Sequence, residues 1–351
     1  MTSERATPKP VDMSERVAVI GAGSWGTAFA TIPADKGVET VLWARREELA
    51  DAINTTHRND RYLPGFDLPA SLSATADVAK AVDGAAAVVM AVPSHAYRPV
   101  FRHVVPHLGA DTPVVSLTKG IEQENMKRMT EVMREEAGLG EDRMAVVSGP
   151  NLAKEVMKRM PSASVVACTD EDRARGLQAL FMAPFFRVYT NSDVIGCELC
   201  GAFKNVIAIA AGIADGMGFG DNSRASLITR GLAEMTRLGV RLGGRALTFA
   251  GLAGMGDLVA TCISRLSRNR TVGEELGRGR KLDEVTREMN MVAEGVKTSR
   301  AVLSLAEREG VEMPIAEHVV KVLYEGVSPR DMVLSLMLRE AKQESHGLGS
   351  N

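Results

Sequence analysis

A glycine-rich turn at residues 21–26 is the first segment whose spacing indicates a ligand. It reads GAGSWG and directly follows a short apolar run, RVAVI, at residues 16–20. In a dinucleotide-binding turn, Gly21 would permit the tight bend, Gly23 would let the backbone approach a pyrophosphate, and Gly26 would let the next helix pack on the sheet. The alternative is a turn that binds nothing. The order of strand, turn and helix favours a dinucleotide at the helix N-terminus.

Two arginines close the next predicted strand, about 20 residues beyond the glycines. Enzymes that select NAD usually place Asp or Glu here, to hold the ribose 2′-hydroxyl. Arg45 and Arg46 stand there instead, and a guanidinium pairs well with a 2′-phosphate. The pair therefore favours NADPH as the hydride donor, with NADH as a second donor. The alternative is that both arginines are solvated at a helix start and bind nothing.

Two lysines are candidates for acid–base chemistry. Hydride transfer to a carbonyl needs a proton donor for the developing alkoxide. Lys204 is the only charged residue between Glu198 and Asp215 in an apolar stretch, where burial would lower its pKa. The alternative, a lysine that reaches the surface, is equally compatible with this segment. Lys119 follows another strand, at the edge where open α/β sheets bind ligands, and the segment SGPN at 148–151 follows the next strand in the same way.

An anion site is indicated by the basic segment SRLSRNRT at residues 264–271. Ser267 is expected to cap a helix that runs to Gly277, so that Arg265, Arg268 and Arg270 crowd its positive end. A phosphate would fit such a site. The alternative, a basic turn in solvent, is equally compatible with the residues alone.

Cysteine and histidine do not indicate a metal site. Cys197 and Cys200 have a C-x-x-C spacing, but they fall in a helical pattern, and Cys168 and Cys262 form no matching second pair. We therefore expect four buried, reduced cysteines. The six histidines form no cluster with ligand spacing, so no metal is predicted.

The elements that must position these residues change type along the chain. Short Val-rich runs alternate with helical patterns in the first half, which predicts a Rossmann-type α/β fold, a doubly wound parallel sheet. The second half is predicted to be mainly α-helical. The expected organisation is a disordered tail at 1–13, an NAD(P)-binding Rossmann domain at 14–193, a helical substrate domain at 194–340 and a tail at 341–351. Strands are expected at 16–20, 40–43, 86–92, 113–117, 144–147, 165–168 and 186–189, and helices at 46–55, 126–137, 171–180, 196–214, 223–242, 271–275, 296–309 and 315–324.

The composition argues against several function classes. The 351 residues carry a formal charge of −2, with 45% hydrophobic and 25% charged residues. This balance gives no reason to expect a nucleic-acid partner or a membrane-surface protein. The first dozen residues lack the apolar core of a signal peptide, and the best candidate for a spanning segment, 84–97, is too short to span a bilayer. We expect a soluble protein of the cytoplasm, without membrane insertion.

Ordered blocks along nearly the whole chain resemble the bacterial NAD(P)-dependent glycerol-3-phosphate dehydrogenase family. They are GAGSWGTA (21–28), SLTKGIE (116–122), SGPNLAKE (148–155), KNVIAIAAGIADGMGFGDNSR (204–224), LITRGLAEM (227–235), GLAGMGDLVATC (251–262), SRNR (267–270), VAEGVKT (292–298) and VEMPI (311–315). The resemblance implies a Rossmann domain followed by a helical substrate domain.

The same resemblance implies roles for individual residues. Lys204 matches the family's proton acceptor in the oxidation direction. The chain departs from the pattern at Trp25, where Tyr is also common, and at Asn151, where Thr or Ser is expected. Cofactor positions are matched by Ser24, Trp25, Arg45, Arg46, Lys119, Ala153, Arg268, Val292 and Glu294. Substrate positions are matched by Lys119, Gly149, Asn151, Lys204, Asp257, Ser267, Arg268 and Asn269.

The activity that the resemblance implies is reduction of dihydroxyacetone phosphate to sn-glycerol 3-phosphate, which supplies glycerophospholipid synthesis. Its phosphate would bind Arg268 and Asn269, and Asp257 would orient either Lys204 or a substrate hydroxyl. A homodimer is expected because the family often associates. One alternative is a 2- or 3-hydroxyacid dehydrogenase of the same plan, which leaves the arginine-rich segment unexplained. Another is a non-catalytic NADPH-binding sensor, which would not need Lys204 and Lys119.

Overall fold

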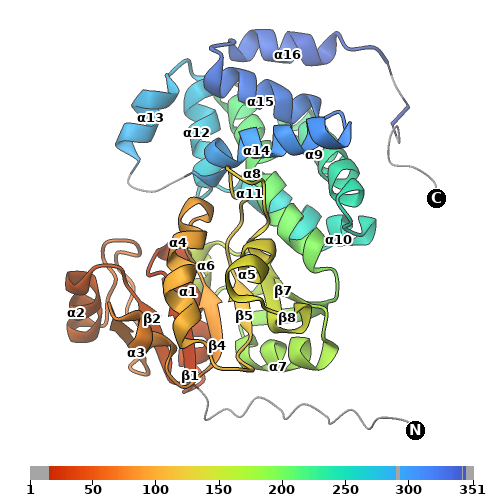
Figure 1. Cartoon of the computed structure of the whole chain (residues 1–351). Coiled ribbons are helices and arrows are strands. Elements are labelled where there is room, and N and C mark those ends of the chain that lie inside the picture. The colour runs from red at the N-terminus through yellow and green to blue at the C-terminus, as the bar shows by residue number, and fades with distance from the viewer. Residues whose placement is uncertain (1–15, 290–292, 342, 345–351) are drawn as a thin grey trace, which may run out of the picture. The chain divides into compact units, whose positions relative to one another are not determined.

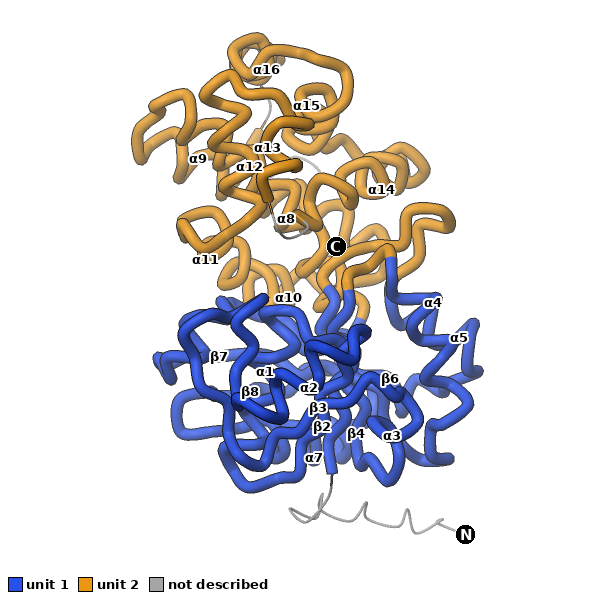
Figure 2. The backbone as a smooth tube through the Cα atoms, turned by 90° about the vertical axis from the view of Figure 1, so that its left-hand side faces the viewer, with its two compact units in different colours: residues 1–92, 96–118, 129–194 blue, residues 93–95, 119–128, 195–351 orange. Residues whose placement is uncertain are grey.

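The computed structural model describes residues 16–289, 293–341 and 343–344. The predicted tail at 1–13, most of the tail at 341–351 and the predicted cofactor residue Val292 lie outside these ranges. The chain folds into two compact units (Figure 2). Unit 1 comprises residues up to 92, 96–118 and 129–194, and unit 2 comprises 93–95, 119–128 and 195 onward. Two short segments of the N-terminal half, one of them carrying Lys119, therefore belong to the helical unit.

Unit 1 is built on an eight-stranded sheet of order β3-β2-β1-β4-β5-β6-β7-β8. Figure 1 labels β1, β2, β4, β5, β7 and β8 of this sheet. All neighbouring strands run parallel except β6 and β7, which are antiparallel. This arrangement confirms the predicted doubly wound α/β fold. The strands are β1 (Arg16–Ile20), β2 (Thr40–Trp43), β3 (Leu72–Thr75), β4 (Ala85–Met90), β5 (Val114–Ser116), β6 (Met144–Ser148), β7 (Ser162–Cys168) and β8 (Phe186–Asn191).

Both faces of this sheet are covered, which is why its strands read as continuous apolar runs. Along β1, Val17 and Val19 join one buried apolar cluster, whereas Ala18 and Ile20 join a second. The helices of this part of the chain are α1 (Ser24–Ala34), α2 (Glu47–Thr56), α3 (Val78–Val82), α4 (Ser94–Val104), α5 (Met129–Ala137), α6 (Ala153–Met157) and α7 (Glu171–Phe181), with short 3₁₀ turns at Val105–His107 and Glu141–Arg143.

The structure corrects several predicted boundaries. Strand β3 was not predicted, because LSAT buries only Leu72 and Ala74 and carries little apolar signal. The helix predicted from residue 126 begins at Met129, since Met126 has a φ of 54°, in the left-handed region that a helix excludes. Strand β4 ends at Met90 rather than at residue 92.

Unit 2 is helical, as predicted. Its longest helix, α8 (Val194–Gly216), is long and apolar enough to cross a membrane by length and composition. The apolar 18-residue window of α8 is 94% buried, however, as in the core helix of a soluble protein. The other elements are α9 (Asp221–Arg241), α10 (Ala246–Ala250), a π-helical segment η3 (Leu252–Gly256), α11 (Asp257–Ile263), α12 (Arg268–Gly277), α13 (Leu282–Glu288), α14 (Glu294–Glu309), α15 (Pro314–Tyr324) and α16 (Pro329–Met337).

Candidate active site

The glycine turn of unit 1 has the geometry expected of a phosphate-binding loop. Gly21 has a φ of +125°, and a Cβ at Gly26 would overlap the carbonyl oxygen of Gly21, so neither position tolerates a side chain. Nothing lies within 4 Å of the place a Cβ would take at Gly23. Gly23 is also the N-cap of α1, and no side chain caps that helix. No side-chain cap therefore competes with an anion at the N-terminus of α1.

Two residues that the sequence analysis missed support this turn. Asn59 is fully buried, and its Nδ2 donates to the Ala22 carbonyl at 3.0 Å and to Thr27 Oγ1 at 2.8 Å. The Tyr62 carbonyl accepts from Ser24 Oγ at 2.8 Å. Neither residue lies in a motif, so no signal in one sequence could have singled them out.

The predicted cofactor arginines differ in their surroundings. Arg46 is the N-cap of α2 and donates to the Tyr62 hydroxyl at 2.9 Å. Arg45 is exposed and makes no hydrogen bond or ion pair within the described ranges. Its guanidinium is therefore available to a ligand. Trp25 packs edge-on against Phe29, with 5.6 Å between the ring centroids, and its indole N–H is buried without a partner in the described structure.

The loop after β6 offers further polar atoms in unit 1. Gly149 has a φ of +144°, which favours glycine. Asn151 Nδ2 donates to Ser164 Oγ at 3.0 Å, whereas Asn151 Oδ1 and the Ser148 hydroxyl are buried without partners among the residues described. Ala153 begins α6 close by. Because buried polar atoms are nearly always paired in native proteins, the two unpartnered groups point to a missing ligand or water.

An ion cluster in unit 2 joins three of the predicted site residues. Lys204, on α8, is 5% exposed, and its Nζ donates to Asp257 Oδ1 at 2.6 Å. Lys119 Nζ donates to the other oxygen, Oδ2, at 2.7 Å. The Thr261 hydroxyl, which the sequence analysis missed, accepts from Lys204 at 2.7 Å. The sequence left open whether Asp257 orients Lys204 or a substrate hydroxyl, and in this structure it binds both lysines.

The surroundings of Lys204 suit a group that exchanges a proton near neutral pH. Burial lowers the pKa of Lys204 to about 8, with Lys119 acting in the same direction and Asp257 opposing both. The π-helical segment η3 precedes Asp257 directly. Gly254 in that segment has no room for a Cβ, which would overlap the backbone of Phe249. Such π-helical turns often occur at functional sites, and this one places Asp257 at the start of α11.

A chain of amides links the ion cluster to the start of α12. Asn205 Nδ2, beside Lys204 in sequence, donates to the Lys119 carbonyl at 3.0 Å. Asn269 Nδ2 donates to Asn205 Oδ1 at 2.8 Å, and Asn269 Oδ1 accepts from the Gly295 N–H at 2.9 Å. The predicted substrate residue Asn269 thus also holds α12 against α8 and α14.

At the start of α12, where an anion site is predicted, the structure forms the expected helix cap but only part of the expected arginine cluster. Ser267 caps the helix, accepting from the Arg270 N–H at 3.3 Å. Arg268 is exposed and makes no hydrogen bond in the described part of the chain. The expectation that Arg270 also crowds this end was wrong, because its guanidinium pairs with Asp215 at 2.7 Å and Glu274 at 2.9 Å. An exposed Arg265 lies before the helix.

The predicted cofactor residue Glu294 is held at the start of α14. Ser94 Oγ donates to Glu294 Oε2 at 2.8 Å. Burial raises the pKa of Glu294, while the Ser94 hydrogen bond and the charges of Arg268 and Lys297 oppose the rise. Unit 2 therefore brings together Lys119, Lys204, Asp257, Ser267, Arg268, Asn269 and Glu294. Unit 1 carries Gly21, Gly23, Ser24, Trp25, Gly26, Arg45, Arg46, Gly149, Asn151 and Ala153.

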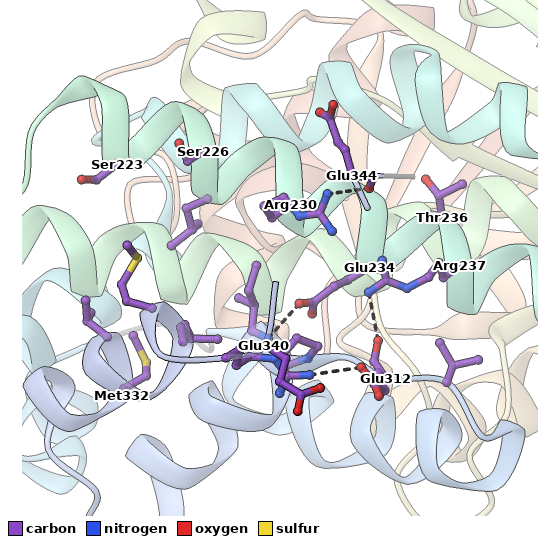
Figure 3. Close-up of a pocket in the computed structure, with 18 of the residues that line it drawn as sticks. Ser223, Ser226, Arg230, Glu234, Thr236, Arg237, Glu312, Met332, Glu340 and Glu344 are labelled. Atoms are coloured by element: carbon purple, nitrogen blue, oxygen red, sulfur yellow. Dashed lines mark hydrogen bonds and ion pairs between the residues drawn. The ribbon is translucent and has the colours of Figure 1, made fainter. Parts of the chain in front are cut away.

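A separate groove of about 1540 Å³ lies along α9 and α16 in unit 2 (Figure 3). Its floor holds Glu234, whose carboxylate accepts from the Ile315 N–H at 2.9 Å at the start of α15. Burial raises the pKa of Glu234 to about 7. Arg237 donates to the Glu312 carbonyl at 3.0 Å across the same groove. None of the predicted site residues lines it.

The cysteines are structural within the described ranges. All four are buried and outside any disulfide bond, and burial raises the pKa of the Cys262 thiol to about 12, which makes it unreactive at neutral pH. No group of three or more His, Cys, Asp or Glu side chains in the described residues could hold a metal ion.

Comparison with known proteins identifies the family. The profile described as NAD-dependent glycerol-3-phosphate dehydrogenase N-terminus matches residues 16–174, and that of the C-terminus matches 193–334. The chain is 56% identical to a glycerol-3-phosphate dehydrogenase (NAD(P)+) of Streptomyces griseus over 94% of this chain and 98% of that relative. A solved glycerol-3-phosphate dehydrogenase from Coxiella burnetii superposes with a TM-score of 0.90 at 39% identity, covering 93% of this chain and 100% of that one.

A eukaryotic structure matches as well. Glycerol-3-phosphate dehydrogenase from Saccharomyces cerevisiae superposes with a TM-score of 0.79 at 30% identity, over 91% of this chain and 98% of that one. The agreement extends through both units, so it covers the glycine turn and the lysine cluster alike. The chain belongs to the NAD-dependent glycerol-3-phosphate dehydrogenase family and is an NAD(P)-dependent oxidoreductase.

Proposed function

We propose that this chain reduces dihydroxyacetone phosphate to sn-glycerol 3-phosphate, that Lys204 is its proton donor, and that it prefers NADPH while also accepting NADH. The observation that carries the proposal is the buried ion cluster. The Lys204 ammonium is held at 2.6 Å by Asp257 and at 2.7 Å by Thr261, and Lys119 occupies the second oxygen of Asp257. Two ammonium groups on one buried carboxylate leave an excess of positive charge there, which suits a site where an alkoxide develops.

Proton transfer follows from the state of Lys204. With a pKa near 8, the ammonium is mostly protonated at pH 7 and loses its proton readily to an alkoxide at C2 of the substrate. In the reverse direction the neutral amine accepts the proton of the C2 hydroxyl. Burial disfavours the charged form most, Asp257 stabilises it and Lys119 disfavours it, and the balance of the three brings the pKa to about 8.

The start of α12 supplies the chemistry to bind the substrate phosphate. Arg268 stands in the first turn of this helix, whose N-terminal N–H groups carry partial positive charge. Burial lowers the pKa of the Arg268 guanidinium, and the charge of Glu294 opposes that shift. Asn269 is fixed there by Asn205 and Gly295, and it keeps one Nδ2 hydrogen for a ligand. We infer that Arg268 is the principal phosphate ligand and that Lys119 binds the substrate as well.

Several residues fit a nicotinamide dinucleotide. The uncapped N-terminus of α1 and the open space at Gly23 suit a pyrophosphate, and the exposed Arg45 suits a 2′-phosphate. When bound, the cofactor supplies the hydride that reaches C2. Asn151, with its unpartnered oxygen, stands where the family pattern has Thr or Ser, and its amide can still donate and accept hydrogen bonds.

The proposal is tested by a panel of substrates with purified protein. NADPH absorbance at 340 nm should fall when dihydroxyacetone phosphate is added, and the product should be sn-glycerol 3-phosphate. Unphosphorylated dihydroxyacetone and a set of keto acids should give little turnover, because they lack the phosphate that α12 binds. Faster turnover of a keto acid would instead identify a hydroxyacid dehydrogenase. NADPH binding without turnover of any of them would identify a sensor.

Location and assembly are part of the same proposal. Four buried cysteines without a disulfide bond support a reducing compartment such as the cytoplasm, where the product would feed glycerophospholipid synthesis. A homodimer is supported by exposed apolar side chains on the helical unit, Leu247 at 86%, Met337 at 79% and Leu338 at 82%. Light scattering on the purified chain gives the molar mass directly, and a monomer at micromolar concentration would contradict the dimer.

A further inference from the structure

Helices α8 and α12 touch backbone to backbone, which few helix pairs do. A Cβ added to Gly212 or Gly216 of α8 would overlap a carbonyl oxygen of α12, that of Arg270 or Glu274. The reverse also holds, since Gly273 and Gly277 of α12 face the carbonyls of Ile209 and Ile213. Each pair of glycines is spaced by four residues, and the contacts advance in the same direction on both helices. The helices are therefore parallel here, in one fixed register.

A buried ion pair fastens the same two helices. Arg270, in the first turn of α12, donates through Nη2 and Nε to Asp215 Oδ2 on α8, at 2.7 and 2.8 Å. The exposed fractions of the two side chains are 10% and 7%. The second oxygen, Asp215 Oδ1, accepts from Arg224 of α9 at 2.8 Å. Both oxygens of Asp215 are thus paired, and the two N–H groups that converge on Oδ2 fix the direction of the Arg270 side chain.

This ion pair lies between two parts of the proposed active site. Lys204 stands on α8, about three helical turns before Asp215. Arg268 and Asn269, the proposed phosphate ligands, are the two residues before Arg270 in the first turn of α12. A helix is stiff over a few turns, so an anchor at Arg270 sets where the phosphate ligands stand relative to the Lys204 ammonium.

We propose that Asp215 and Arg270 are positioning residues that fix the distance between the proton donor and the phosphate site. They thereby select substrates whose phosphate is one carbon from the carbonyl. The proposal rests on the proposed function of Lys204 and Arg268. Arg270 is not itself a phosphate ligand, because Asp215 and Glu274 already neutralise and orient its guanidinium. Neither positioning residue needs to touch the substrate.

The two possible roles of Arg270 predict opposite effects for Asp215→Asn. If Asp215 only keeps the Arg270 guanidinium from binding the substrate phosphate, removing the Asp215 charge would let Arg270 bind that phosphate. KM for dihydroxyacetone phosphate would then fall. If Asp215 positions α12, the first turn loosens and that KM rises. We expect a rise of about ten- to hundredfold, the range for a lost charged hydrogen bond. KM for NADPH and for unphosphorylated dihydroxyacetone should change less than about twofold.

Substrate length gives a second readout that a general loss of stability would not move. Erythrulose 4-phosphate carries its phosphate one carbon farther from the carbonyl. The wild-type protein should prefer dihydroxyacetone phosphate strongly in kcat/KM, and Asp215→Asn should reduce that preference at least tenfold. Asp215→Glu, which keeps the charge, should restore part of both effects. Arg175→Gln is the control, since it breaks an exposed ion pair on α7, away from this network, and should change neither.

The outcomes separate the two proposals. A wild-type protein that does not reduce dihydroxyacetone phosphate refutes the proposed function, whatever the variants do. If the wild type is active, three results would overturn the positioning role. Asp215→Asn could lower KM for dihydroxyacetone phosphate, leave both readouts unchanged, or affect dihydroxyacetone phosphate and erythrulose 4-phosphate equally. Should Asp215→Asn fail to fold by circular dichroism, Arg270→Lys is measured in the same way, since it keeps the charge and loses the planar set of N–H donors that reaches both Asp215 and Glu274.

Discussion

Replacing Asp257 with Asn isolates the electrostatics of the lysine cluster. Asp257 is 2% exposed and accepts from Lys204 at 2.6 Å and from Lys119 at 2.7 Å. The amide keeps the shape of the carboxylate and removes its charge. Since an opposite charge at this distance shifts a pKa by about 1–3 units, the pKa of Lys204 should fall that far below its value of about 8.

The rates in the two directions should then change in opposite ways. Oxidation of glycerol 3-phosphate needs the neutral amine, so the rising limb of its pH profile should move to lower pH by about 1–3 units. Reduction of dihydroxyacetone phosphate needs the ammonium, so at pH 7 its kcat should fall. Both profiles are measured at 340 nm with the wild-type protein and the variant. A limb that stays at the wild-type pH would show that the titrating group is not a lysine under the influence of Asp257.

The stability of the same variant should depend on pH. At low pH both lysines stay charged without their partner, and breaking a buried ion pair costs about 3–5 kcal/mol. As pH rises toward 8, Lys204 loses its proton first in the variant, so the variant gains stability relative to the wild type. Denaturant unfolding at pH 6 and pH 9 should show the larger difference at pH 6. An equal difference at both would mean that Lys204 keeps its proton throughout.

Three further predictions concern other sites. Replacing Arg45 and Arg46 together with Ala should weaken NADPH binding at least tenfold and leave NADH binding little changed in titrations, because only NADPH carries the 2′-phosphate; equal losses would contradict this. Arg268→Ala should raise KM for dihydroxyacetone phosphate by about one to two decades and leave that for dihydroxyacetone unchanged, with NADPH affinity measured alongside. Burial raises the pKa of Glu234 from 4.5 to about 7. Between these two pH values the Glu234 carboxyl stays protonated in the folded state but ionises in the unfolded chain. Unfolding free energy should therefore fall as pH rises through that interval, and Glu234→Gln should flatten this slope in denaturant titrations.

The sequence was most informative where one segment carries its own signal. The strand, glycine turn and helix at the N-terminus follow from the spacing of Gly21, Gly23 and Gly26, and the structure shows why two of the three admit no side chain. Antiparallel pairing of β6 with β7 left no such signal, because a buried strand reads the same in either direction.

Partnerships between distant residues could not be predicted in the same way. The isolation of Lys204 in an apolar helix marked it as a candidate, but its contact with Thr261, 57 residues away, has no local signature. The three arginines around Ser267 looked alike in sequence. Only the fold shows that Arg270 forms an ion pair with Asp215, whereas Arg268 is exposed.

The most direct test of the central claim is kcat for reduction of dihydroxyacetone phosphate by NADPH in the Lys204→Ala variant. General acid catalysis contributes about 10²–10⁴-fold, so kcat should fall by that factor while KM for NADPH stays within about twofold. Lys80→Ala, which removes an exposed lysine on α3, should behave as the wild type. A Lys204→Ala protein that keeps more than about a tenth of the wild-type kcat would contradict the account, and another group would have to supply the proton.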